Sequence, residues 1–193
     1  KRLLRVYNQS AATLNLLRAF TIGGFADLNK AHIWNQEFIA QSPQGQRYKK
    51  IATSIDDALT FMGAVGINAK THSALKLTEF FTSHEALLLG YEHALTRQDS
   101  ITKKWYICSG HFLWIGDRTR QPDGAHVEFL SGIDNPIGIK IGPSITEDEL
   151  MKLIEKLNPE NEWGRITLIS RMGAEKIRKK LPPLIRKIYN NGK

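Results

Sequence analysis

The sequence has very little cysteine and no long hydrophobic run. One cysteine among 193 residues, Cys108, excludes a disulfide framework and any zinc site built from several cysteines. Its aromatic and apolar neighbours predict a small buried residue rather than a reactive thiol. No apolar stretch approaches the ~20 residues that a membrane-spanning helix needs, and no signal peptide is evident. We therefore expect a reducing, cytoplasmic location and no membrane partner.

Several functional motifs are also missing. The chain has neither a glycine-rich dinucleotide fingerprint nor a Walker phosphate loop, and no internal repeat of 20–50 residues. His84 and Glu85 can form a ligand–base pair, but Leu88 stands where a zinc-protease helix needs its second histidine. His111 is interpreted as a hydrogen-bonded core histidine. Four well-placed metal ligands are not visible in the sequence.

Positive charge is in excess, with 27 Lys and Arg against 19 Asp and Glu and a formal net charge of +8. This balance suits an anionic ligand, and nucleic acid is the usual first guess for a basic chain. The cations are scattered, however, and the densest cluster, at 178–180, lies on a predicted helix where a solvated face is the simpler interpretation. We expect no nucleic-acid partner.

The first seventy residues predict helices. Apolar residues recur at helical spacing over 8–20, 27–40 and 48–65, with glycine- or proline-containing breaks between them. We assign residues 1–75 to a helical segment and residues 76–193 to a second part with a different periodicity.

The second part alternates strands and helices. Strands are predicted at 79–82, 105–116, 137–141 and 166–169, and helices at 86–97, 124–132, 147–157 and 174–189. Thr146 and Glu149 form a capping-box pattern at the start of the third helix, and Pro182 and Pro183 predict a break or kink in the last one. Such alternation is typical of parallel strands in right-handed βαβ units, so we predict an α/β fold.

Charged residues stand at or just after the end of each predicted strand: Glu85, Asp117 with Arg118, Lys140, and Arg171. One such charge is usually a solvated loop residue, but four at the same edge of a parallel sheet face one cavity. Nearby glycines allow backbone amides to approach a ligand. The residues therefore favour a site for a phosphorylated or carboxylated small molecule.

Several of these motifs resemble a known family. The segments His111–Gln121, Asp123–His126, Asn135–Gly138 with Lys140, Ser170–Gly173 and Ser83–Leu87 are similar to the type II (plant-like) 3-deoxy-D-arabino-heptulosonate 7-phosphate (DAHP) synthases. The similarity covers nearly the whole chain. It implies part of a TIM (β/α)8 barrel, about four βα units corresponding to strands three to six, and hence a fragment of one catalytic domain. It also implies that the helices of residues 1–75 are an insertion that makes subunit contacts.

The resemblance implies a transferase that condenses phosphoenolpyruvate with erythrose 4-phosphate, the first step of the shikimate pathway to chorismate and the aromatic amino acids. It implies a homo-oligomer and a divalent metal, Mn2+ or Co2+, whose ligands lie outside this chain, so no metal ligand is assigned within it. The alternative interpretation is a non-catalytic half-barrel that binds phosphorylated ligands or mediates assembly.

The resemblance also assigns site residues. Asp117, Arg118, Lys140 and Arg171 are expected to bind phosphoenolpyruvate, Glu85 to lie near the metal and the aldehyde, and Trp114 to line the pocket. Two positions depart from the family pattern, since Asp117 replaces a usual Glu and Pro122 replaces Leu or Ile. A backbone contact at position 117 survives that change, whereas a shorter side chain can fail to reach the ligand.

Overall fold

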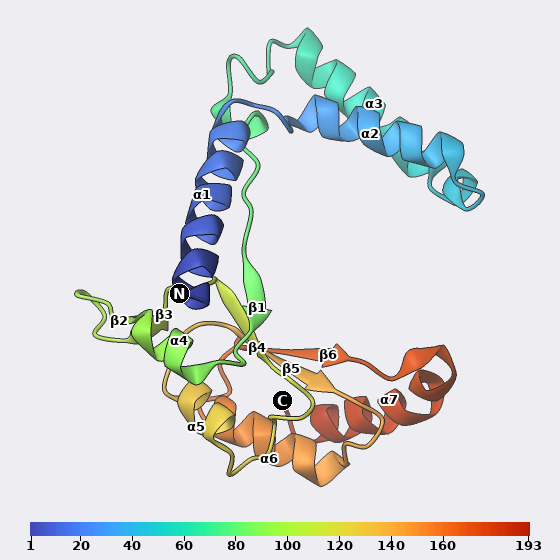
Figure 1. Cartoon of the computed structure of the whole chain (residues 1–193). Coiled ribbons are helices and arrows are strands. Elements are labelled where there is room, and N and C mark those ends of the chain that lie inside the picture. Colours follow the sequence, from blue (N-terminus) through green and yellow to red (C-terminus); the bar gives the residue numbers. More distant parts are fainter. The chain divides into compact units, whose positions relative to one another are not determined.

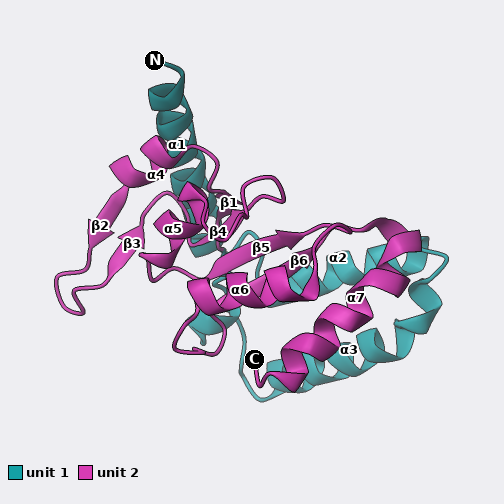
Figure 2. Cartoon of the chain, turned by 90° about the horizontal axis from the view of Figure 1, so that it is seen from below, with its two compact units in different colours: residues 1–80 teal, residues 81–193 magenta.

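The computed structural model describes residues 1–193 and divides into two compact units, Lys1–Phe80 and Phe81–Lys193. Figure 1 shows the elements along the chain and Figure 2 colours the two units separately. Each unit is described by itself. The predicted domain boundary between residues 75 and 76 stays a prediction.

The first unit is helical. It contains α1 (Arg2–Ile22), α2 (Leu28–Gln41) and α3 (Lys49–Ala64), with short 3-10 turns η1 (Gly45–Arg47) and η2 (Ser73–Leu75). The Asp27 carboxylate caps α2 by accepting a hydrogen bond from the Lys30 amide. The three predicted helices are confirmed, and α1 extends further in both directions than the sequence indicated.

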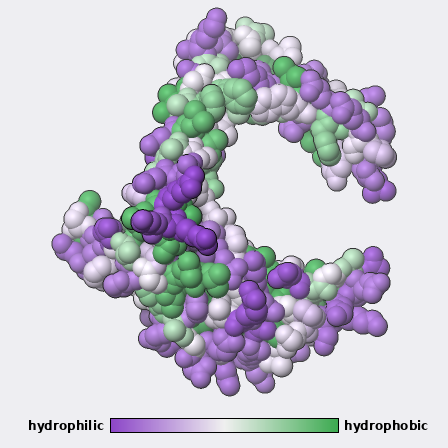
Figure 3. Space-filling view, in the orientation of Figure 1, coloured by the Kyte–Doolittle hydropathy of each residue, from purple (hydrophilic) through white to green (hydrophobic).

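Few side chains of this unit are buried. α2 and α3 lie side by side (Figure 1), and His32 and Ala52 are buried between them and the η1 turn, whereas α1 has no buried residue. A Cβ at Gly45 would lie 1.9 Å from the Ile39 carbonyl oxygen, so only glycine fits at this turn. Many apolar side chains of the three helices remain exposed, and Figure 3 shows them as green areas among polar ones.

The second unit contains a four-stranded parallel sheet in the order β1-β4-β5-β6. Its strands are β1 (Ser83–Glu85), β4 (Phe112–Ile115), β5 (Ile137–Ile141) and β6 (Ile166–Ser170). Helices α5 (Ala125–Ser131), α6 (Glu147–Leu157) and α7 (Gly173–Asn190) follow the last three strands. The predicted α/β class with parallel strands is confirmed. The sheet is consistent with part of a TIM barrel, and no barrel is closed.

The hydrophobic core lies on one face of this sheet. Leu113, Ile115, Ile137, Ile139 and Ile141 alternate along β4 and β5 and are at most 1% exposed. Helices α5, α6 and α7 cover this face (Figures 1 and 2) with residues of the same core cluster. The intervening residues of the strands therefore point to the opposite face, where the site described below is found.

Helix α6 illustrates how the sequence builds this layer. Thr146 caps the helix by accepting a hydrogen bond from the Glu149 amide, as predicted. Three acidic residues in the first turn complement the helix dipole. Its apolar stripe packs on the sheet through Leu150, Leu153 and Leu157, each fully buried.

The first predicted strand was misplaced. The apolar run at 79–82 precedes the actual strand, β1, because pairing with β4 begins at Ser83 opposite Phe112. The Thr82 carbonyl accepts hydrogen bonds from the amides of His111 and Phe112. Phe81 is exposed and meets the His111 ring edge-on rather than entering the core.

The predicted strand 105–116 is also wrong, because it is two strands with different partners. β3 (Trp105–Ile107) pairs antiparallel with β2 (Thr96–Gln98), outside the parallel sheet, and β4 starts only at Phe112. The buried Asn135 side chain fixes the turn between them by bonding both the amide and the carbonyl of Ile107. The predicted helix 86–97 accordingly shrinks to α4 (Leu89–Ala94).

Three smaller expectations need correction. Cys108 is exposed on the turn after β3 instead of buried. His111 is hydrogen-bonded to Thr82, as expected, but is exposed rather than in the core. Helix α7 runs without a break across Pro182 and Pro183, so of the expected break or kink the break is wrong and the kink stays a prediction. None of the helices in the structure combines the length and apolarity needed to cross a bilayer.

Candidate functional site

The carboxyl ends of the four parallel strands gather five charged residues at one edge of the sheet. Glu85 is the last residue of β1, Lys140 lies near the end of β5, and Asp117, Arg118 and Arg171 follow β4 and β6 within a few residues. In α/β folds this edge is where ligands bind. The sheet topology therefore brings all of the sequence-predicted charges to the same side.

Glu85, Trp114 and Lys140 form the centre of this edge. Glu85 pairs with Trp114 across β1 and β4, and Trp114 pairs with Gly138 across β4 and β5, so these positions share the face opposite the helices. The Lys140 Nζ lies 3.7 Å from the Glu85 Oε2 and 4.8 Å from the centre of the Trp114 ring. A carboxylate and an aromatic face thus hold the ammonium group in place.

Two glycines make room for this arrangement. A Cβ at Gly116 would lie 2.2 Å from the Glu85 Oε1, and a Cβ at Gly138 would lie within 2.8 Å of Phe112, Trp114 and Ile169. The indole N–H of Trp114 is buried and has no hydrogen-bond partner. Such an unsatisfied donor is uncommon in folded proteins and is typical of positions where a ligand or water completes the bonding.

The two arginines at this edge differ from Lys140. Arg118 and Arg171 are exposed, and no carboxylate pairs with either side chain. Their guanidinium groups remain available to an anion, for which a planar donor fork is suited. Together with Lys140 they supply three cations from three different strands.

The side chain of Asp117 is already engaged within the protein. Its Oδ1 accepts a hydrogen bond from the Gly142 amide at 3.1 Å and one from the Arg120 Nε at 3.0 Å. The carboxylate thus joins the loop after β4 to the residue that follows β5. Its side chain is therefore occupied by contacts within the protein.

A cluster below this edge was not predicted. The His84 Nε2 lies 2.7 Å from the Glu92 Oε1, and the Ser109 hydroxyl donates to the other oxygen of Glu92, which is only 2% exposed. The interpretation of His84 with Glu85 as a pair is wrong, because neighbouring residues of a strand point to opposite faces. The alternation of side chains along a strand was therefore the signal in the sequence that places His84 and Glu85 on opposite faces.

The structure contains no group of three or more His, Cys, Asp or Glu side chains that could hold a metal ion. Glu85 is held by Lys140, His84 by Glu92, and Cys108 lies on an exposed turn. These residues do not fit a divalent-metal site of their own. We therefore assign no chemical step of this chain to a bound metal.

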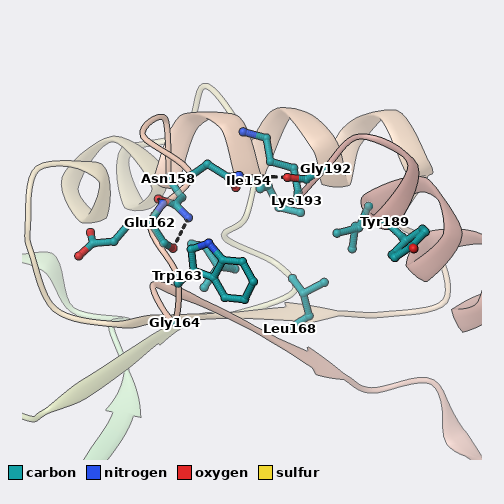
Figure 4. A pocket seen from close by; sticks show the side chains of 12 residues that line it. Ile154, Asn158, Glu162, Trp163, Gly164, Leu168, Tyr189, Gly192 and Lys193 are labelled. Atoms are coloured by element: carbon teal, nitrogen blue, oxygen red, sulfur yellow. Dashed lines mark hydrogen bonds between the residues drawn. The ribbon is translucent and has the colours of Figure 1, made fainter.

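A hollow of about 500 Å3 lies at the other end of the sheet in the second unit. Figure 4 shows it between the end of α6, strand β6 and the end of α7, with Trp163, Leu168 and Tyr189 among its walls. The Asn158 side chain accepts from the Glu162 amide and donates to its carbonyl beside this hollow. Its only lining cation is Lys193, so it lacks the convergent positive charge of the first site.

Comparison with known proteins gives a consistent result. Residues 1–193 match the class-II DAHP synthetase family. The chain is 57% identical over 192 residues to a phospho-2-dehydro-3-deoxyheptonate aldolase of Streptomyces coelicolor, covering 100% of this chain and 42% of that protein. It is 46% identical over 196 residues to the aldolase AroG of Mycolicibacterium smegmatis, covering 99% and 42%. The chain thus spans about two fifths of the length of these curated relatives.

Proposed function

The chain belongs to the class-II DAHP synthetase family, and from this premise we propose that it carries the phosphoenolpyruvate-binding part of an enzyme that makes DAHP. The substrates are phosphoenolpyruvate and erythrose 4-phosphate, and the products are DAHP and phosphate. This reaction starts the shikimate pathway, and we place it in the cytoplasm. The alternative of a non-catalytic half-barrel is not favoured, because both relatives carry the name of the enzyme.

One observation supports the proposal more than any other, namely the convergence of Arg118, Lys140 and Arg171 at one edge of the sheet. Phosphoenolpyruvate carries a phosphate and a carboxylate, so it needs several donors at short range. Two arginines without acidic partners and a lysine between them match that requirement. The net positive charge of the chain attracts such a ligand.

Each predicted residue takes a distinct part in the proposed site. Arg118 and Arg171 bind the phosphate, and Lys140 bridges the phosphate and the reacting carbons. Glu85 fixes the Lys140 ammonium and lies on the side from which the aldehyde enters. Trp114 forms the floor, and its free indole N–H donates to the ligand or to a water that accompanies it. Asp117 contributes its backbone amide.

The proposed chemistry joins carbon 3 of phosphoenolpyruvate to the aldehyde carbon of erythrose 4-phosphate. Carbon 2 then becomes cation-like, water adds to it, and the bond from carbon 2 to the phosphate oxygen breaks to release phosphate. The residues of this chain bind and orient phosphoenolpyruvate for this attack. Holding the reacting atoms in line in this way lowers the activation free energy by a large part of its value. The family implies a divalent metal for the aldehyde, and its ligands are not among these residues.

The proposal is tested by titrating the intact protein with phosphoenolpyruvate in a calorimeter. Replacing Lys140, Arg118 or Arg171 by Ala removes a charged hydrogen bond worth about 1.5–3 kcal/mol, so each variant should bind roughly ten- to a hundredfold more weakly. Lys179→Ala, an exposed cation on α7, is the matched control and should bind normally. Unchanged binding in all three site variants would reject the assigned site.

We also propose that the protein self-associates through its helical unit. α1 has 21 residues and buries none of them, and Leu4, Phe38 and Phe61 are each at least 68% exposed on the three helices. Exposed apolar patches of this extent are typical of protein interfaces.

A further inference from the structure

Arg120 is the one lysine or arginine of the chain that is buried, with 5% of its surface exposed. A buried guanidinium is costly unless carboxylates compensate its charge. Arg120 stands two residues after Arg118, which is exposed and available to the ligand. A cation so close to the proposed anion site, yet withdrawn from solvent, requires a separate explanation.

Two carboxylates from different elements compensate Arg120. Its Nε donates to the Asp117 Oδ1 at 3.0 Å, and its Nη1 donates to the Glu149 Oε1. Asp117 lies in the loop after β4, and Glu149 lies in the first turn of α6. The planar guanidinium thus bridges two segments that are separated in the sequence by helix α5 and strand β5.

Asp117 extends the bridge to a third segment. It accepts a hydrogen bond from the Gly142 amide. Its carboxylate oxygens lie 2.8 Å from the point where a Cβ of Gly142 would be, so only glycine leaves room for them. Gly142 is two residues beyond Lys140. The loop that carries Arg118 is therefore joined through Asp117 to the end of β5, the strand that carries Lys140, and Arg120 holds Asp117 in that position.

We infer that Arg120 is a positioning residue of the anion site, which acts through Asp117 to set the place of Arg118 relative to Lys140. This inference rests on the proposed function. Arg120 does not touch the ligand, because its donors face two carboxylates and its side chain is covered.

The arrangement gives a reason for the aspartate at position 117. The carboxylate sits between the Gly142 amide and the Arg120 guanidinium, at hydrogen-bond distance from both. A glutamate would add a methylene to a space that the Asp117 carboxylate already fills, beside the position that a Cβ of Gly142 would take. Asp117 and Arg120 are accordingly matched in length to this loop.

The test measures phosphoenolpyruvate affinity of the intact protein by calorimetry for Arg120→Ala, Arg120→Lys and Glu149→Gln. We expect roughly tenfold weaker binding for Arg120→Ala, and an intermediate loss for Arg120→Lys, since a lysine keeps the charge but not the two-pronged geometry. Glu149→Gln removes one of the two ion pairs of Arg120. Because the Glu149 side chain is one-third exposed, this variant serves as the main one if Arg120→Ala does not fold. Lys156→Ala, which breaks an exposed ion pair with Glu128, is the control and should leave affinity unchanged.

A double-mutant cycle separates positioning from general damage. If Arg120 acts through Arg118, the variant that lacks both arginines should bind no more weakly than Arg118→Ala alone. Additive losses would overturn the inference, as would normal affinity in both Arg120→Lys and Glu149→Gln. If Arg118→Ala itself binds normally, the proposed site fails instead, so the two failures are distinguishable.

Discussion

Gly138 has no side chain because three neighbours occupy the space. The ring of Phe112 and the side chains of Trp114 and Ile169 all lie within 2.8 Å of the point where its Cβ would be. The packing of Trp114 at the floor of the site therefore requires a glycine at position 138. We predict that Gly138→Ala destabilises the protein by about 1–3 kcal/mol, because overpacking forces these side chains from their preferred rotamers.

The measurement is thermal or urea unfolding of Gly138→Ala beside Gly90→Ala. Gly90 lies in α4, where a Cβ meets nothing within 4 Å, so its substitution should be neutral or slightly stabilising. Equal stabilities of the two variants would contradict the packing argument. Weaker phosphoenolpyruvate binding by Gly138→Ala is a second expected result, since Trp114 is displaced.

At the scale of single residues, the sequence predicted which charged groups gather at the edge of the sheet, but not which of them are free to bind a ligand. The strand-end rule located Arg118, Lys140 and Arg171 correctly at one edge. It could not distinguish Asp117, whose side chain is consumed by Arg120 and Gly142. Arg120 is only three positions away, but Gly142 lies 25 positions further along the chain, and nothing local in the sequence records that contact.

A polar cluster ties the hairpin strand β3 to the loop before β5. The Tyr106 hydroxyl donates to the Asp134 Oδ2 at 2.7 Å, and the Lys104 Nζ lies 3.0 Å from the Asp134 Oδ1. Partial burial works to raise the pKa of Asp134, but the hydrogen bonds from Tyr106 and Lys104 outweigh it, and the pKa is held below its ordinary value of 3.8.

This cluster predicts a pH dependence of stability. Because the pKa of Asp134 is lower in the folded than in the unfolded protein, its contribution is present above pH 3.8 and is lost as the pH falls below that value. Asp134→Asn should lower the melting temperature at neutral pH by about 2–4 °C, and the difference from the parent should shrink toward pH 2.

The control is Asp123→Asn, an exposed carboxylate without a hydrogen bond or ion pair. It should follow the parent at every pH. A constant difference between Asp134→Asn and the parent from pH 7 to pH 2 would show that the cluster does not act through the charge of Asp134.

At the scale of elements, long periodic segments were predictable and short ones were not. Helix α6 and strand β5 match their predicted bounds, because each has a complete apolar pattern and, for α6, a cap at Thr146. The strands β2 and β3 have three residues each, and β3 is separated from β4 by a turn that the buried Asn135 fixes from a distance. The apolar run around them resembles one long strand until that contact is known.

At the scale of the whole molecule, the exposed apolar helices predict self-association. Sedimentation velocity over a hundredfold range of concentration should report a mass of two or more chains. Leu4→Glu combined with Phe61→Glu should shift the protein toward the monomer, since each charge would have to be buried at an interface. Gln9→Glu combined with Thr60→Glu, which alters polar positions of the same two helices, is the matched control. A monomer at all concentrations would reject the proposed interface.

The order of the parallel sheet has a consequence for how the protein is made on the ribosome. Each strand pairs with the one that precedes it in the sheet, and paired residues are fewer than about thirty positions apart. Each βα unit can thus dock on its predecessor as it leaves the exit tunnel, with no need to wait for distant segments. Glu85 emerges first and Arg171 last among the site residues, so the nascent chain gains its full set of anion-binding groups only after β6 has joined the sheet.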